Sequence, residues 1–156
     1  MTSLVHRFIE EAGNMTQSIG LGRVVGQLYV FLYFSRTPRS LGDMQDALGV
    51  SKGSASTSVR QLEQWGAVRK VWVKGDRRDY YVAVTWFGRI FKNAMADLVG
   101  KRLRAYTDIL ERIEEEMESE KDGDGAFVRG QLRKLRLFHD RVESLWSNPL
   151  LQRLLK

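Results

Sequence analysis

Apolar residues recur every three or four positions over two stretches near the start of the chain, which predicts two amphipathic helices. The first stretch covers 4–12, and Gly13 with the following asparagine is expected to end that helix. The second covers 20–34 and is closed by Pro38, because proline cannot continue a helix. Both helices have one apolar face and therefore require a partner to pack against.

A third, shorter helix is predicted over 41–48. Ser40 and Asp43 have the spacing of an N-cap and its N3 residue in a capping box. Gly49 follows as a C-cap residue, and Ser51 is the N-cap of another helix. A short helix, a three-residue turn that contains glycine and a second helix together predict helix-turn-helix geometry.

The pattern then changes from helical spacing to runs of strand-forming residues. Valines and a tryptophan over 67–74 predict one strand, and 79–84 predicts its return strand. The turn between them, 75–78, carries two arginines, so the sequence predicts a β-hairpin with a basic tip. Trp72 and Tyr81 are expected to form the core side of this sheet.

The remainder of the chain returns to helical spacing. Thr85 caps a predicted helix of about 32 residues, about 48 Å long at about 1.5 Å per residue, in which Gly100 marks a bend. A polar turn at 121–125 separates it from a last helix over 126–147, and 150–156 forms a short apolar tail. The predicted fold class is mostly α with a small β-hairpin (α+β).

Composition limits the classes of protein that fit this pattern. Hydrophobic residues make up 43% of the 156, enough for a folded core. The chain has no cysteine, which excludes disulfides and thiolate metal sites and favours the reducing cytoplasm. No apolar run is long enough to span a bilayer, so no membrane partner is expected.

Charge is distributed unevenly along the chain. The formal net charge is +6, which by itself favours a polyanionic partner only weakly. Residues 51–78, however, hold seven basic and two acidic side chains, whereas 108–124 hold nine acidic and two basic ones. The first segment is expected to form a binding face, and the second would be repelled by phosphate.

The helix that begins at Ser51 has an unusual composition, because its first two turns are rich in serine and glycine, which are poor helix formers. On a helical wheel Val59, Leu62 and Gly66 fall within about 40° of Ala55, and this side forms the core face of the helix. The opposite side is small at its start and carries one guanidinium a turn later. Its members are Gly53, Ser56, Thr57, Arg60 and Gln64.

A thin helix face of this kind fits the major groove of duplex DNA, which is about 12 Å wide and admits a helix whose first turns lack bulk. Hydroxyls bind phosphates or base edges, and arginine binds guanine through two hydrogen bonds. A capped surface helix is the alternative explanation. The short helix before, the basic hairpin after and the charge distribution favour DNA binding.

The hairpin adds candidate contacts beside this helix. Arg77 and Arg78 at its tip are placed to contact phosphates or a minor groove, and Asp76 is placed to hold one guanidinium. Several such contacts predict a steep salt dependence of binding. The predicted DNA-binding residues are Ser51, Lys52, Gly53, Ser54, Ser56, Thr57, Arg60, Lys74, Arg77 and Arg78.

The stretches "GVSKGSASTSVRQLEQWGAV" and "RKVWVKGDRRDYYVAVT" resemble the winged helix-turn-helix of the MarR family of transcriptional regulators, most closely its GbsR-type branch. The wing Asp-x-Arg of that family matches Asp76 and Arg78. The resemblance is strongest over 20–92 and covers the topology through 147. It implies a homodimeric transcriptional regulator. We expect the dimer to occupy a pseudo-palindromic operator and to repress transcription, although the residues leave activation as the alternative.

The resemblance also implies a domain organisation. The winged helix-turn-helix DNA-binding domain would occupy 20–84, and the flanking segments 1–19 and 85–156 would form a helical dimerisation region. A small-molecule effector would bind where the two parts meet. Relatives in this branch that respond to choline or betaine make an aromatic cage conceivable, with Tyr29, Trp72, Tyr81 and Trp86 as candidates.

Other functions find little support in the sequence. Gly20–Gly26 resembles a dinucleotide fingerprint, but its spacing is wrong by one and no strand precedes it, so close helix packing explains these glycines better. His6 and His139 are the only histidines, which makes a metal site improbable. No arrangement of a nucleophile and a base predicts an enzyme, and no cofactor is expected. A winged-helix protein–protein interaction module is the alternative function.

Overall fold

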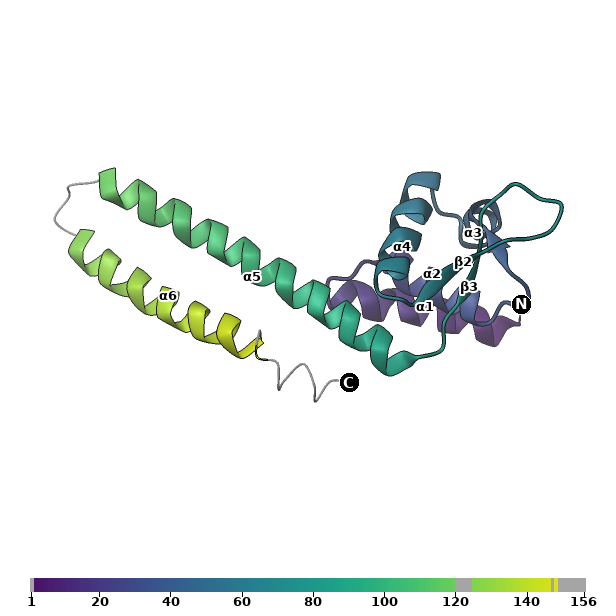
Figure 1. The fold of residues 1–156 in the computed structure, drawn as a ribbon, viewed down its shortest axis with the longest axis horizontal. Helices are drawn as coiled ribbons and strands as arrows, with labels where there is room; N and C mark the ends of the chain where they lie inside the picture. The colour runs from purple at the N-terminus through teal and green to yellow at the C-terminus, as the bar shows by residue number, and fades with distance from the viewer. Residues whose placement is uncertain (1, 120–124, 147, 149–156) are drawn as a thin grey trace. The chain divides into compact units, whose positions relative to one another are not determined.

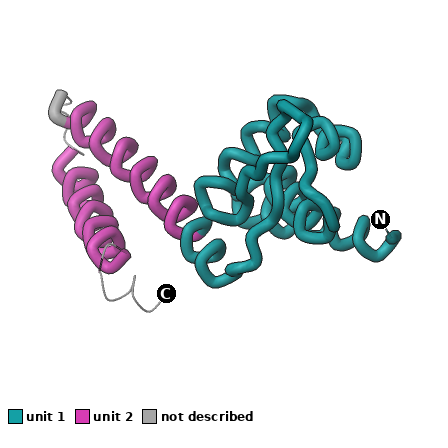
Figure 2. The backbone as a smooth tube through the Cα atoms, turned by 45° about the vertical axis from the view of Figure 1, so that its right-hand side comes forward, with its two compact units in different colours: residues 1–94 teal, residues 95–156 magenta. Residues whose placement is uncertain are grey.

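The computed structural model describes residues 2–119, 125–146 and 148 (Figure 1). The chain forms two compact units, residues 1–94 and residues 95–156 (Figure 2). The predicted apolar tail over 150–156 lies outside the described residues, as does most of the predicted polar turn at 121–125. No helix in the described part of the chain is both long and apolar enough to cross a membrane.

The described residues form six helices and three short strands. The helices are α1 (Ser3–Ser18), α2 (Arg23–Tyr33), α3 (Leu41–Leu48), α4 (Lys52–Gln64), α5 (Phe87–Ser119) and α6 (Gly125–Trp146). The strands are β1 (Arg39–Ser40), β2 (Val68–Val71) and β3 (Tyr80–Ala83). This composition confirms the predicted class of a mostly helical α+β fold.

α1 packs against α2, and two glycines allow the close approach. A Cβ atom on Gly26 would lie 2.3 Å from the carbonyl oxygen of Ala12, and one on Gly13 would lie 2.8 Å from the Gln27 side chain. The prediction that Gly13 ends the first helix was wrong, because Gly13 serves this packing and α1 continues to Ser18. The interpretation that the glycines permit close helix packing is confirmed at Gly26.

The helix-turn-helix forms as predicted, because its signals are local. The Ser40 hydroxyl accepts from the Asp43 amide at 3.3 Å, and the Asp43 carboxylate accepts from the Ser40 amide at 2.8 Å, so the capping box is complete. These bonds lower the pKa of Asp43, led by the Ser40 amide. Gly49 ends α3 in the left-handed conformation with φ +64°. Met44 of α3 is fully buried, whereas Ala47 is exposed.

The three strands form an antiparallel sheet in the order β1-β3-β2. Val71 pairs with Tyr80 and Val68 with Ala83, which gives the predicted hairpin, and β1 adds a third strand through Ser40 and Tyr80. We call β2, β3 and the connecting residues 72–79 the wing. The two-residue strand β1 was not predicted.

Tyr81 and Trp72 were both expected on the core side of the sheet, which is confirmed for Tyr81 and wrong for Trp72. Tyr81 is 6% exposed, and its burial raises the pKa of its hydroxyl. Trp72 is 77% exposed, because β2 already ends at Val71 and the strand alternation does not extend to the indole. The main core of the first unit contains Leu28, Phe31, Met44, Val59, Leu62, Trp65, Val68 and Ala94, among others.

In the second unit, helices α5 and α6 lie against each other. Leu110 and Leu132 are buried, and Arg136 of α6 makes ion pairs with Glu111 and Glu114 of α5 at 3.7 and 3.5 Å. α5 runs without interruption through Gly100, and the bend expected there stays a prediction.

Candidate nucleic-acid interface

The N-terminus of α4 is closed by its own serines. The Ser51 hydroxyl accepts from the Ser54 amide at 3.2 Å and donates to the Ser54 hydroxyl at 3.0 Å. Ser51 is therefore an N-cap, as predicted. Lys52 and Gly53, in the first turn, are exposed, and a Cβ on Gly53 would meet open space out to 4.0 Å. The free amides of this turn and the small side chains leave room for an anion.

The two faces of α4 divide as the helical wheel predicts. Ala55, Val59 and Leu62 are at most 2% exposed and hold the helix against the core. On the outward side Gly53, Thr57 and Arg60 are exposed. Lys52 and Ser54, which lie at the edges of this side, are exposed as well. Ser56 differs from the expectation because it is only half-exposed. The outward side is thus small over its first two turns, with the first bulky group at Arg60.

Arg60 lies along the helix that carries it. Its Nε donates to the backbone carbonyl of Ser56 at 3.4 Å, which leaves the terminal nitrogens of the guanidinium available to a ligand. Those nitrogens carry the paired donors that bind two acceptors of guanine or a phosphate. Arg60 has the chemistry for either contact.

In the wing, Asp76 holds Arg78 rather than Arg77. The Arg78 side chain donates to both Asp76 carboxylate oxygens, from Nε at 3.0 and 3.2 Å and from Nη2 at 2.6 Å, and the Arg78 amide donates at 2.9 Å. Sequence reasoning foresaw this role of Asp76. Arg78 is still 63% exposed at its side chain, so the guanidinium is fixed and solvent-accessible.

Tyr80 completes this network, and sequence reasoning missed it. Its hydroxyl donates to Asp76 at 2.8 Å and accepts from Arg78 Nη2 at 2.7 Å, while the guanidinium lies 5.4 Å from the ring centroid. Because β3 places Tyr80 opposite Ser40 and Val71, the ring is set by the sheet. We call Asp76, Arg78 and Tyr80 the wing clamp.

The electrostatics of the wing clamp follow from these bonds. The pKa of Asp76 is held well below its usual range, first by the Arg78 side chain, then by the Arg78 amide and the Tyr80 hydroxyl. The same contacts raise the pKa of Arg78 and of Tyr80, in both cases led by the hydrogen bond with Asp76. Charged Asp76 and Arg78 are therefore the stable forms at neutral pH.

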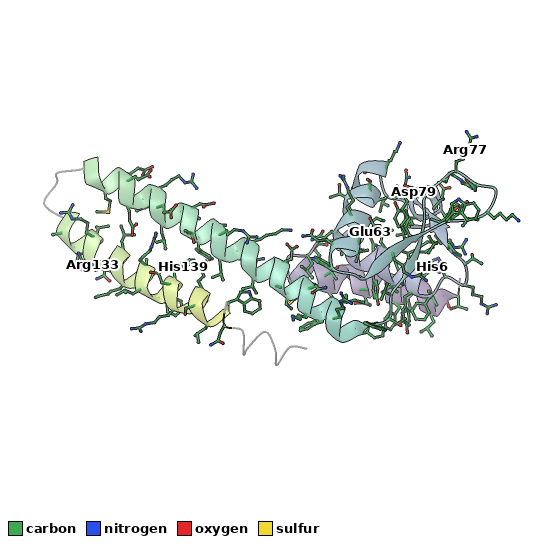
Figure 3. The ribbon with its side chains drawn as sticks, in the orientation of Figure 1. His6, Glu63, Arg77, Asp79, Arg133 and His139 are labelled. Atoms are coloured by element: carbon green, nitrogen blue, oxygen red, sulfur yellow. The ribbon has the colours of Figure 1, made fainter. Side chains whose placement is uncertain are left out.

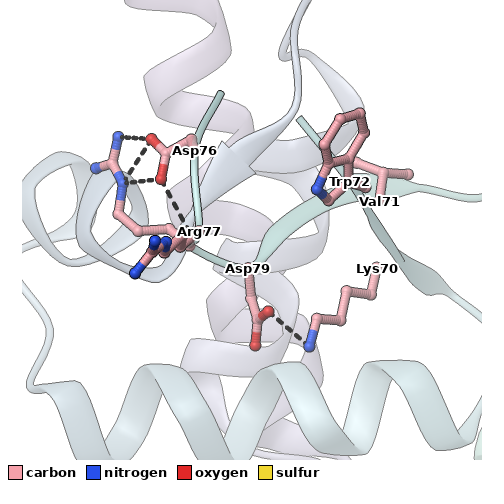
Figure 4. Close-up of a pocket in the computed structure, with 7 residues that line it drawn as sticks. Lys70, Val71, Trp72, Asp76, Arg77 and Asp79 are labelled. Carbon is pink, nitrogen blue, oxygen red and sulfur yellow. Dashed lines mark hydrogen bonds and ion pairs between the residues drawn. The ribbon is translucent and has the colours of Figure 1, made fainter. Parts of the chain in front are cut away.

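Two further predicted wing contacts, Lys74 and Arg77, are exposed. Among the described residues, no side-chain partner holds either of them. Figure 3 shows Arg77 extending outward from the wing. Lys70, by contrast, forms an ion pair with Asp79 at 2.6 Å, which raises the pKa of Lys70 (Figure 4). The wing thus carries two cations bound to carboxylates, Lys70 and Arg78. Its three other cations form no ion pair within the described part of the chain, and they are Arg69, Lys74 and Arg77.

The four aromatic candidates for a ligand cage are not joined by ring contacts. Tyr29 lies 6.2 and 6.5 Å from the rings of Tyr33 and Phe87, and its hydroxyl donates to the carbonyl of Val84 at 2.8 Å. Burial and the nearby Tyr33 raise the pKa of Tyr29 to about 12. Trp86 is 67% exposed, and within the described residues no ring contact joins it to Tyr29. An effector site stays a prediction.

One group in the second unit brings metal-ligating atoms together. His139, Asp140 and Glu143 each place one such atom within 4.8 Å of the others. The Nε2 atom of His139 lies 3.1 Å from the carbonyl of Leu103 on α5, as fits a buried histidine that packs between the two helices. Arg136 lies 3.8 Å from Asp140, and its positive charge opposes a second cation there. The arrangement does not support a metal centre.

Comparison with known proteins points to one family. Residues 19–79, which include α2, α3, α4 and most of the wing, match the model of the MarR family. The chain is 32% identical over 106 residues to the HTH-type transcriptional regulator MmpR5 of Mycobacterium tuberculosis, covering 67% of this chain and 60% of that protein. It is 36% identical over 74 residues to the HTH-type transcriptional repressor GbsR of Bacillus subtilis, covering 47% of this chain and 41% of the relative.

A solved structure matches a larger share of this chain than either of these two relatives does. A crystal structure described as a transcriptional regulator superposes with a TM-score of 0.61 at 25% identity, over 97% of this chain and 99% of the other. The chain therefore spans three fifths or less of the two curated relatives above, but nearly all of this solved chain.

Proposed function

Because the chain belongs to the MarR family, we propose that it is a transcriptional regulator that binds duplex DNA as a homodimer. The observation that carries the proposal is the thin outward side of α4, with the basic wing in the same unit. A helix built in this way enters a major groove, and a wing with exposed cations contacts the adjacent backbone or minor groove.

The roles of the residues follow from their exposure and bonding. Thr57, Ser56 and Arg60 are assigned to the major groove, with Arg60 as the base-reading side chain. Ser54 lies at the edge of this surface, where its hydroxyl is engaged by Ser51. Lys52 and Gly53 are assigned to phosphate at the start of α4. Lys74, Arg77 and Arg78 are the wing contacts.

Exposed apolar side chains near both ends of the chain support the homodimer. In the first unit Leu4, Phe8 and Met15 of α1 are more than half exposed. In the second unit the same holds for Phe127, Leu137, Phe138 and Leu145 of α6. Apolar surface of this extent marks an interaction site. A two-fold dimer would present two α4 helices to two half-sites, so the operator should be pseudo-palindromic.

Repression of transcription is the regulatory outcome that we propose, since a dimer that occupies an operator competes with other proteins for that DNA. The similarity to GbsR, which is described as a repressor, supports this choice. We place the protein in the cytoplasm. The proposed DNA target lies in that compartment, and a chain without cysteine fits its reducing conditions.

Selection of bound sequences from a pool of random duplexes, followed by mobility shifts at increasing salt, tests the proposal. We expect a pseudo-palindromic consensus and a log–log salt slope that grows by about 0.9 for each phosphate contacted. Light scattering at micromolar concentration should give the mass of a dimer. Absence of salt-sensitive duplex binding would contradict the proposal and favour a protein–protein interaction module, and a monomer would contradict the palindrome.

A further inference from the structure

The wing carries an exposed tryptophan that neither the core nor the contacts described above account for. Trp72 is 77% exposed, although the residue before it, Val71, is half-buried in the sheet. An indole left in water on a charged hairpin exposes a large apolar surface with no benefit to folding. This surface is available to a ligand.

Trp72 borders a hollow of about 560 Å³ on the wing. Figure 4 shows the indole on one side of the hollow and Asp76 with Arg77 on the other, while Lys70 and Asp79 lie beside it. The hollow therefore combines one flat apolar wall with several charged side chains.

The charges around the hollow favour an anion. Residues 69–79 contain five basic and two acidic side chains. Both acids are bound within the wing, Asp76 by Arg78 at 2.6 Å and Asp79 by Lys70 at 2.6 Å. Of the three cations that line the hollow, Lys70 and Arg78 are the ones bound to these acids. The Arg77 guanidinium has no side-chain partner among the described residues, so it is the lining cation most available to an incoming phosphate.

A nucleotide unit of duplex DNA meets both requirements, because its phosphate is anionic and its deoxyribose has an apolar face. We propose that Trp72 is a further DNA-contact residue, whose indole packs on a deoxyribose while Arg77 binds the adjoining phosphate. This inference rests on the proposed function, and it assigns DNA contact to a residue that the sequence placed in the sheet core.

Two exposed tryptophans of the same unit provide a matched comparison. Trp72→Ala should weaken binding to the selected duplex by about tenfold, as truncation of an aromatic contact to nucleic acid does. Trp86→Ala removes an indole that is 67% exposed but lies outside the wing, and it should leave the affinity unchanged. Trp72→Phe should retain most of the affinity, because a flat ring remains. Light scattering and thermal melting of each variant verify dimer and fold.

Tryptophan fluorescence gives a second readout. Addition of the duplex should quench emission in the Trp86→Ala protein and leave little response in the Trp72→Ala protein. Unchanged affinity and quenching in Trp72→Ala, while wild type binds the duplex, would overturn the inference and leave the proposed function intact. Quenching of Trp72 by tetramethylammonium but not by duplex would overturn it in favour of a cation site. Failure of the wild type to bind any duplex would overturn both proposals.

Discussion

α4 and the wing position their polar side chains in opposite ways. On the outward side of α4 the first two turns are small, and Arg60 is tied only to the backbone of its own helix at 3.4 Å. In the wing, Arg78 is fixed by Asp76 and Tyr80 through side-chain bonds of 2.6–3.2 Å. The outward side of α4 is therefore defined by its lack of bulky side chains over the first two turns. The wing is defined by the hydrogen bonds among its side chains.

The difference suggests a division of work. A thin helix fits the groove and adjusts its side chains to base edges, so it should determine sequence preference. A rigid basic hairpin loses little conformational entropy on contact with the backbone, so it should contribute affinity for any sequence. Changes in α4 should alter which DNA is bound, and changes in the wing should alter how tightly DNA is bound.

The largest expected effect comes from adding bulk to the thin side of α4. Thr57→Trp should keep the helix out of the groove and reduce binding of the selected duplex to its non-specific level, a loss of about 4–10 kcal/mol. Thr57 is exposed, so thermal stability should change little. Gln64→Trp is the matched control, because it adds the same bulk two turns later on the same side. Equal losses of duplex affinity for both variants would contradict the proposal that the first two turns of α4 enter the major groove.

A smaller effect is expected from removal of the guanidinium of α4. Arg60→Ala should cost about 1–3 kcal/mol of specific binding and relax one position of the operator. Repeating the selection from random duplexes with the variant measures that relaxation. An unchanged consensus would remove Arg60 from base readout.

In the wing, loss of one hydroxyl should have a modest effect. Tyr80→Phe removes the hydrogen bond that the hydroxyl donates to Asp76 and the one that it accepts from Arg78. The guanidinium becomes less ordered, so DNA binding should weaken by about threefold. If Tyr80 acts by positioning Arg78, the same change should have no effect in an Arg78→Ala background. Equal losses in both backgrounds would show that Tyr80 acts independently of the clamp.

The smallest expected effect is on the stability of the protein at low pH. The folded pKa of Asp76 is lowered, so the contribution of the clamp to stability is fully present above the unfolded pKa of about 3.9 and is lost as pH falls through the lower folded value. Carboxyl carbon shifts, followed by NMR down to about pH 2, should show Asp76 titrating below an ordinary aspartate. Tyr80→Phe should raise that pKa. A normal Asp76 titration in wild type would contradict the clamp.

Local signals made the centre of the fold predictable. Capping residues lie within three positions of the groups that they bond, as Ser40 with Asp43 and Ser51 with Ser54, so α3 and the start of α4 were found from the sequence alone. The inward side of α4 was predictable for the same reason, since helical periodicity connects residues that are near in sequence.

One error arose where a distant residue decides the structure, and two others arose in the wing. Gly13 was taken for a helix end, but the neighbouring side chain of Gln27 on α2 explains why no Cβ is present there. Trp72 was assigned to the core because the predicted strand over 67–74 extended past the end of β2 at Val71. Tyr80 was missed although a signal existed, since Arg78 and Tyr80 have the two-residue spacing that places side chains on one side of an extended chain.

The salt dependence of two single variants tests the division between α4 and the wing most directly. On the selected duplex, Arg77→Ala should lower the log–log salt slope by about 1 and weaken all sequences alike. Arg60→Ala should leave the slope nearly unchanged and weaken the preferred sequence much more than others. The account is contradicted if the two variants lose the same slope, or if Arg77→Ala changes the preferred sequence.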